Sequence, residues 1–179
     1  MVPEIETLIG GEFDPGRGDG YVLAEPDPGP ELSWCVVPVV RLPRPQPFRE
    51  PKCMPRGINW RRRLIRQLRP QRGALPCCWY HGGDWHIVNK AAIRLVRAAE
   101  QAGVSADDFP EWCRPQIKTL GLTEWEALAL KSLVAGPGIA IDPGTSGQFT
   151  NGQHRAQAML DAGVQRTVVI HLKYPGDAD

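Results

Sequence analysis

Apolar side chains recur at helical spacing in two segments of the middle of the chain. Val88, Leu95 and Ala99 belong to a repeat that predicts an amphipathic helix over residues 88–102, ending at Gly103. Further on, Thr123 and Glu126 have the spacing of a capping box, which predicts a second helix that continues to Val134. The expected apolar stripe of this helix is Trp125, Leu128, Ala129, Ser132 and Leu133.

The C-terminal third has a different pattern, in which short apolar runs alternate with turn residues. It predicts strands at 138–142 and 148–150, a helix at 151–163 that ends at Gly163, and a strand at 164–172. With the two helices before it, this order predicts an α+β fold: a small mixed sheet with packed helices.

Nine prolines between residues 26 and 55 leave no room for a long helix in the N-terminal part, because each removes a backbone donor and biases the preceding residue away from the helix. The apolar runs 21–24 and 34–40 are candidate strands, and Pro38 indicates an edge position. They either extend the main sheet or belong to an arm that orders on a partner. We therefore divide the chain into an acidic, then proline-rich, irregular segment at 1–56 and an α/β domain at 57–179.

Charge is distributed unevenly along the chain. Residues 1–40 carry −7, residues 41–72 carry +10 and residues 73–179 carry −2, which together give the net charge of +1. The basic block at 41–72 either attracts polyanions such as nucleic acid or is neutralised by the acidic block at 1–40 of the same molecule.

A short basic helix is expected at 59–69, within the basic block. Trp60, Leu64 and Leu68 form its apolar stripe. The arginines that we expect to contact DNA phosphates are Arg61, Arg62, Arg63, Arg66 and Arg69. Alternatively, the helix docks by its apolar stripe and leaves its basic face in solvent.

The five cysteines are odd in number and irregularly spaced, which argues against a disulfide framework. Cys77 or Cys78 with His81, His86 and Cys113 would supply enough ligands for zinc, but this spacing matches no standard zinc motif. We therefore expect no metal, with the thiols packed as small apolar groups beside Trp79, Tyr80 and Trp85. A cysteine nucleophile with a histidine base is a further alternative.

The first residues and the apolar runs of the sequence argue against an exported or membrane protein. The first residues are acidic, and the apolar runs are far shorter than the roughly 18 residues that a membrane helix needs. We expect a cytoplasmic protein with reduced thiols.

The expected strand-to-helix turn at Asn151, Gly152, Gln153, His154 and Arg155 has the composition of a phosphate site. Gly152 would let a ligand approach the backbone, and the amides of Gln153, His154 and Ala156 would open the helix with its positive dipole end. Since an arginine at a helix start buries little apolar surface, we expect that replacing Arg155 with alanine removes the ligand and leaves the fold intact.

The run Gly152 to Ala158, Gly-Gln-His-Arg-Ala-Gln-Ala, fits a Gly-x-x-Arg-x-x-Ala pattern between a strand and a helix. In this respect residues 138–172 resemble the core of the ParB/sulfiredoxin superfamily. The resemblance implies that His154 and Arg155 hold nucleotide phosphates, of ATP or CTP with Mg²⁺. Gln153 departs from the family, because it stands where sulfiredoxins have their catalytic cysteine and ParB proteins an acid.

The resemblance implies a ParB-like protein that binds a nucleotide and acts with DNA, with hydrolysis of nucleotide or nucleic-acid phosphate bonds as the accompanying chemistry. The alternatives are a phosphotransferase of the same superfamily acting on a small molecule or a protein, and a binding module without catalysis. No catalytic residue is assigned.

Overall fold

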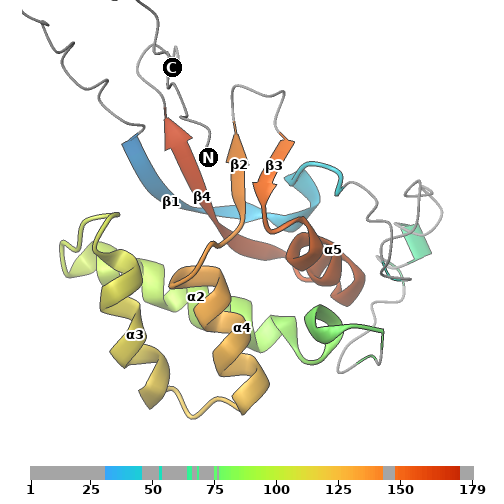
Figure 1. The fold of residues 1–179 in the computed structure, drawn as a ribbon, viewed down its shortest axis with the longest axis horizontal. Helices are drawn as coiled ribbons and strands as arrows, with labels where there is room; N and C mark the ends of the chain where they lie inside the picture. The colour runs from blue at the N-terminus through green and yellow to red at the C-terminus, as the bar shows by residue number, and fades with distance from the viewer. Residues whose placement is uncertain are drawn as a thin grey trace, which may run out of the picture.

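The computed structural model describes residues 31–45, 53, 64, 65, 68, 75, 77–142 and 148–173. Over these residues the fold is α+β, as predicted, with four α-helices packed on a mixed sheet of four strands (Figure 1). In chain order the elements are β1 (Glu31–Pro38), the 3-10 turns η1 (Val39–Arg41) and η2 (Trp79–His81), α2 (Trp85–Gln101), α3 (Phe109–Thr119), α4 (Glu124–Val134), β2 (Ala140–Asp142), β3 (Gln148–Asn151), α5 (Gln153–Ala162) and β4 (Arg166–Lys173).

The sheet has the strand order β1-β4-β2-β3. β1 pairs antiparallel with β4 from Glu31 opposite Lys173 to Pro38 opposite Arg166, and β2 pairs parallel with β4 and antiparallel with β3. The strand expected at 34–40 is therefore an edge strand of the main sheet, and Pro38 lies at its end. The other candidate strand, 21–24, lies outside the described residues.

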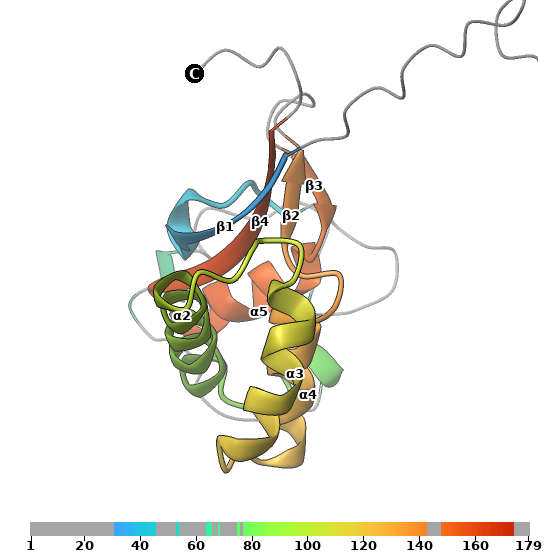
Figure 2. The ribbon, with the colours of Figure 1, turned by 90° about the vertical axis from the view of Figure 1, so that its left-hand side faces the viewer.

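Helices α2, α3 and α4 form a layer on one side of the sheet, as the two views together indicate (Figures 1 and 2). The largest side chains in the interior include Trp85, Leu130, Leu133 and Met159, which are almost fully buried. Burial of apolar surface on this scale is the main stabilising contribution to such a layer. None of the helices that the structure describes combines the length and apolar character needed to cross a bilayer.

Local capping signals set the starts of two of these helices. The capping box of α4 is confirmed: the Thr123 side chain accepts a hydrogen bond from the Glu126 amide, and the Glu126 carboxylate accepts one from the Thr123 amide. α2 begins at Trp85, earlier than predicted, because the Asp84 carboxylate accepts from the His86 amide and caps the helix there.

The predicted apolar stripe of α4 is wrong in part. The buried residues of this helix are Ala129, Leu130, Leu133 and Val134, whereas Leu128 is 47% exposed. The packed face is thus rotated: α2 and α3 both contact α4, and Leu130 and Val134 belong to the common core.

Helix α3 was not predicted. Pro110 lies in its first turn, where proline is tolerated, and Pro115 lies inside it, where proline removes a backbone hydrogen bond. Its buried residues, Phe109, Cys113 and Ile117, are nevertheless spaced by four, and packing of this stripe compensates for the interior proline.

Candidate metal centre and anion pocket at the start of helix α5

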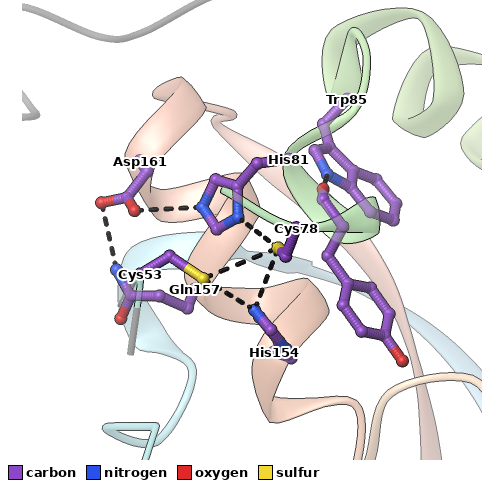
Figure 3. Close-up of polar contacts among 8 residues, drawn as sticks. Cys53, Cys78, His81, Trp85, His154, Gln157 and Asp161 are labelled. Atoms are coloured by element: carbon purple, nitrogen blue, oxygen red, sulfur yellow. Dashed lines mark hydrogen bonds and ion pairs between the residues drawn. The ribbon is translucent and has the colours of Figure 1, made fainter. Parts of the chain in front are cut away.

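Four side chains from three separate parts of the chain converge beside the first turns of α5 (Figure 3). They are Cys53, Cys78, His81 and His154, and their ligand atoms all lie within 4.8 Å of one another. The two Sγ atoms are 3.6 Å apart; Nε2 of His154 lies 3.2 Å from Sγ of Cys53 and 3.4 Å from Sγ of Cys78; and Nδ1 of His81 lies 3.1 Å from Sγ of Cys78. Soft and borderline metal ligands thus face a common centre.

The turn η2 places two of these side chains together. Cys78 precedes this single 3-10 turn and His81 ends it, and the His81 amide donates to the Cys78 carbonyl at 3.2 Å. The turn is fixed from outside by Trp125, whose Nε1 donates to the Trp79 carbonyl at 2.9 Å. A Cβ on Gly83 would lie 2.3 Å from the Trp125 ring, so a glycine is needed for this approach.

Helix α5 supports the cluster with three polar side chains on one face. His154, Gln157 and Asp161 are spaced by three and four residues, which brings them into one row. Nε2 of His81 donates to Oδ2 of Asp161 at 3.2 Å, and Nε2 of Gln157 donates to Oδ1 of the same carboxylate at 3.1 Å. Because the carboxylate accepts from Nε2, Nδ1 is the ring nitrogen of His81 that faces Cys78.

Burial and mutual contacts shift the pKa values of the cluster in opposite directions. Burial, followed by the charge of His81, lowers the pKa of His154 to about 4, so this imidazole is neutral. Burial by itself lowers the pKa of His81, but hydrogen bonds with Asp161 and Cys78 outweigh it, and the net shift is upward. For Cys78, burial raises the pKa, and hydrogen bonds with His81 outweigh that effect and lower it. Cys78 therefore has more thiolate character than Cys53, whose pKa burial raises to about 12.

The zinc alternative of the sequence analysis has only Cys78 and His81 in common with this cluster. His86 is elsewhere, with Nε2 donating to the Ala162 carbonyl at 2.8 Å, and Cys113 is fully buried on α3. Cys53 and His154 were missed as partners. Cys53 lies in the proline-rich segment, and the interpretation of His154 as a phosphate ligand drew attention away from its contacts with the two cysteines.

The turn residues assigned to nucleotide binding line a pocket on the adjacent side of the α5 start. Its volume is about 310 Å³, and its lining consists of Tyr80, Thr150, Asn151, Gly152, Gln153, His154 and Arg155. The ring of Tyr80 lies against that of His154, with centroids 4.4 Å apart. His154 is therefore common to the pocket and to the Cys/His cluster.

Gly152 is required by the fold itself. It has a φ of 85°, and a Cβ there would lie 2.8 Å from the Gly138 carbonyl oxygen and from Cα of Ile139. The close approach that we expected of a ligand is thus made by the backbone before β2. The expectation of a free Ala156 amide is also wrong, because this amide donates to the Gly152 carbonyl at 2.9 Å.

Arg155 is far more buried than its position at a helix start led us to expect. Its side chain is 4% exposed, and Nη2 donates to the Gly138 carbonyl and, at 2.8 Å, to Oδ1 of Asn151. Its Nε has no hydrogen-bond partner, and no carboxylate among the described residues pairs with the guanidinium. Burial lowers its pKa, against a smaller opposing effect of Tyr80.

The basic helix expected at 59–69 lies largely outside the described residues, including Trp60 and Arg61, Arg62, Arg63, Arg66 and Arg69. Leu64, Ile65 and Leu68 are helical, and they are 47%, 56% and 73% exposed. Leu64 and Leu68 thus do not dock as a buried stripe.

Comparisons of the chain with protein-family models, with curated proteins and with solved structures found no match.

Proposed function

We propose that the pocket lined by Asn151 to Arg155 binds a phosphate group of a nucleotide, in a ParB-like protein that acts with DNA. The observation that carries the proposal is the state of Arg155: a buried guanidinium that lines the pocket without a carboxylate partner among the described residues. A buried charge is costly unless it is paired, and the cost falls when an anion enters the pocket.

The position of the pocket adds a second contribution that favours an anion, the dipole of helix α5. It lies at the N-terminal end of α5, where the helix dipole is equivalent to roughly half a positive charge. A phosphate there would meet both the dipole and the guanidinium, and the hydroxyls of Tyr80 and Thr150 are additional donors in the lining.

Binding is better supported than catalysis. The described lining holds neither a carboxylate nor a thiol, and Gln153 occupies the position at which the superfamily that this turn resembles has its cysteine or acid. General-base or metal-assisted hydrolysis depends on such a group. The proposal is therefore for a nucleotide-binding module, and the choice among ATP, CTP and GTP is left to the experiment.

A charge series at Thr150 tests the pocket without touching Arg155 or His154. Thr150 is exposed on β3 and lines the pocket, so Thr150→Gln, Thr150→Glu and Thr150→Lys change the local charge with little effect on packing. At roughly 6 Å and an effective dielectric constant of about 20, one unit charge contributes about 2.8 kcal/mol, which is about 100-fold in the affinity for a phosphate before screening by salt.

Calorimetric titration with inorganic triphosphate, ATP, CTP and GTP should give the affinity order Lys, Gln, Glu, with differences that shrink in high salt. Equal affinities for Thr150→Glu and Thr150→Gln would place the ligand elsewhere. Absence of binding by the wild type at millimolar nucleotide would refute the proposal.

The DNA partner depends on the arginines of the basic segment. Replacing Arg61, Arg62 and Arg63 with glutamine should weaken binding to duplex DNA equally for all sequences and flatten its salt dependence, because phosphate contacts carry no base information. Fluorescence anisotropy at several salt concentrations measures both quantities. A wild-type protein that binds no DNA at low salt would remove this partner from the proposal.

A further inference from the structure

We propose that Cys53, Cys78, His81 and His154 bind one Zn²⁺ ion as a closed, structural site. The proposal goes beyond nucleotide binding and does not rest on it: His154 lines both sites, but the argument for zinc uses only the contacts of the Cys/His cluster. It rests on four ligand atoms of the right chemical type that already face one another, and on polar groups that orient one of them.

The spacing of the four atoms fits a tetrahedral ion. With Zn–S of about 2.3 Å and Zn–N of about 2.0 Å, tetrahedral angles separate two sulfurs by about 3.8 Å and a sulfur from a nitrogen by about 3.5 Å. The two sulfurs are 3.6 Å apart, and the three sulfur–nitrogen distances are 3.1, 3.2 and 3.4 Å. In these four pairs the ligand atoms would have to move apart by only a few tenths of an ångström, and the other two pairs lie within 4.8 Å.

The ligand set selects the metal. Two thiolates and two imidazoles are poor ligands for Mg²⁺ and Ca²⁺, which prefer oxygen, and a tetrahedral set of two sulfurs and two nitrogens is typical of Zn²⁺. Since all four positions would be filled by protein atoms, no position is left for water. This is the arrangement of structural zinc sites rather than catalytic ones.

The contacts around His81 are those of an oriented metal ligand. The carboxylate of Asp161 accepts from Nε2 of His81 and is itself held by Gln157, and all three side chains are at most 5% exposed. A histidine that binds a metal usually donates its other ring nitrogen to a carboxylate or carbonyl in this way. Thiol packing alone would not call for a buried carboxylate at this position.

Such an ion would join parts of the chain that are far apart in sequence. Cys53 and His154 are separated by 101 residues, and Cys53 and Cys78 by 25. The ion would attach Cys53 to η2 and to the first turn of α5. Because His154 also lines the pocket, zinc would fix one wall of the anion site.

Metal content and cobalt substitution test the site. Protein purified without a metal-affinity tag should contain about one zinc ion per chain, as measured by inductively coupled plasma mass spectrometry. Replacement of zinc with Co²⁺ should give the intense visible bands of tetrahedral cobalt and a thiolate-to-cobalt charge-transfer band. Cys53→Ser, Cys78→Ser and His154→Gln should lose stoichiometric zinc, and each serine variant should lose part of the charge-transfer intensity.

Matched controls are available for both residue types. Cys35 lies on β1 and His171 is exposed on β4, so Cys35→Ser and His171→Gln should retain full zinc content and an unchanged cobalt spectrum. If these controls lose as much metal as the cluster variants, or if the wild type contains and takes up no zinc, the proposal is refuted.

A second measurement on the wild type does not depend on whether the variants fold. Zinc should protect Cys53 and Cys78 from alkylation, as mapped by peptide mass, while the exposed Cys77 reacts. A chelator should then expose both cysteines. Equal alkylation of Cys53 and Cys78 with and without zinc, or a disulfide between them in freshly purified protein, would contradict the site.

Discussion

Helices α2, α3 and α4 bury apolar side chains against one another, whereas the corner where Cys53, η2 and α5 meet is joined through thiols, imidazoles and a carboxylate. We call the first region the helical layer and the second the Cys/His corner. Apolar packing is non-directional and needs no partner from solution. Converging metal ligands are of little use to stability without an ion, because thiol hydrogen bonds are weak and buried polar groups are costly. The comparison predicts that the layer folds regardless of metal and that the corner depends on it.

The largest effect is expected in the helical layer. Leu133→Ala removes a fully buried side chain from α4 and should lower the free energy of unfolding by about 2 to 5 kcal/mol. Leu128→Ala on the same helix is the matched control, because Leu128 is 47% exposed and its loss should cost about 0.5 kcal/mol or less. Urea denaturation with and without chelator measures both, and the difference between the variants should be unaffected by metal.

If Leu128→Ala proves as costly as Leu133→Ala, the packed face of α4 is the one that the sequence predicted. If chelation abolishes the difference, the layer and the corner unfold as one unit and the comparison fails.

Arg155 follows the cluster residue His154 on α5, and its hydrogen-bond partners, Gly138 and Asn151, lie outside both regions. Arg155→Ala removes hydrogen bonds from a buried charged group to the Gly138 carbonyl and to Asn151, so the protein without ligand should lose about 1.5 to 3 kcal/mol of stability. This reverses the expectation from sequence that the fold would be untouched. Because these partners lie outside the Cys/His cluster, zinc content should stay at the wild-type level.

Thermal denaturation and elemental analysis of Arg155→Ala give the two readouts. A melting temperature equal to that of the wild type would mean that the cost of burying the guanidinium offsets its two hydrogen bonds. Arg155→Lys, which keeps the charge, should lie between the wild type and Arg155→Ala.

The difference between the helical layer and the Cys/His corner also explains which parts of the fold the sequence could predict. The helical layer is encoded locally: the capping box at Thr123 and the repeat containing Val88 and Leu95 lie within single helices, so both helices were found. The strands of the C-terminal third were predicted in the same local way, but their order in the sheet was not predicted. α3 was missed because Pro115 obscures a stripe that its packing reveals.

The residues of the Cys/His corner are close in space but far apart in the sequence. His81 and Asp161 are 80 residues apart, and Cys78 and His154 are 76 apart. No short sequence motif can therefore contain either pair. The adjacent Cys77 and Cys78 are equivalent in a sequence, and only the turn η2 selects Cys78. The burial of Arg155 was equally hidden, since it depends on how the backbone before β2 passes over α5.

A smaller and more selective effect is expected from Asp161→Asn. The substitution weakens the acceptor that orients His81 and should reduce zinc affinity by about 10- to 100-fold. Asp107→Asn changes an exposed aspartate before α3 and should leave the affinity unchanged. Competition with a chromophoric chelator measures the affinities. An unchanged value for Asp161→Asn would mean that Asp161 serves the apo fold alone.

The smallest effect is expected at the helix cap that the sequence predicted. Thr123→Ala removes the hydroxyl that accepts from the Glu126 amide and should cost about 1 kcal/mol, whereas Thr123→Ser keeps the acceptor and should cost less. The cap belongs to the helical layer and touches no member of the cluster, so its cost should be the same with zinc and with chelator. Denaturant titrations of both variants under the two conditions test this. A cost that appears only when metal is bound would mean that α4 is ordered through the corner, by way of the contact between Trp125 and Trp79, and that the layer is not independent.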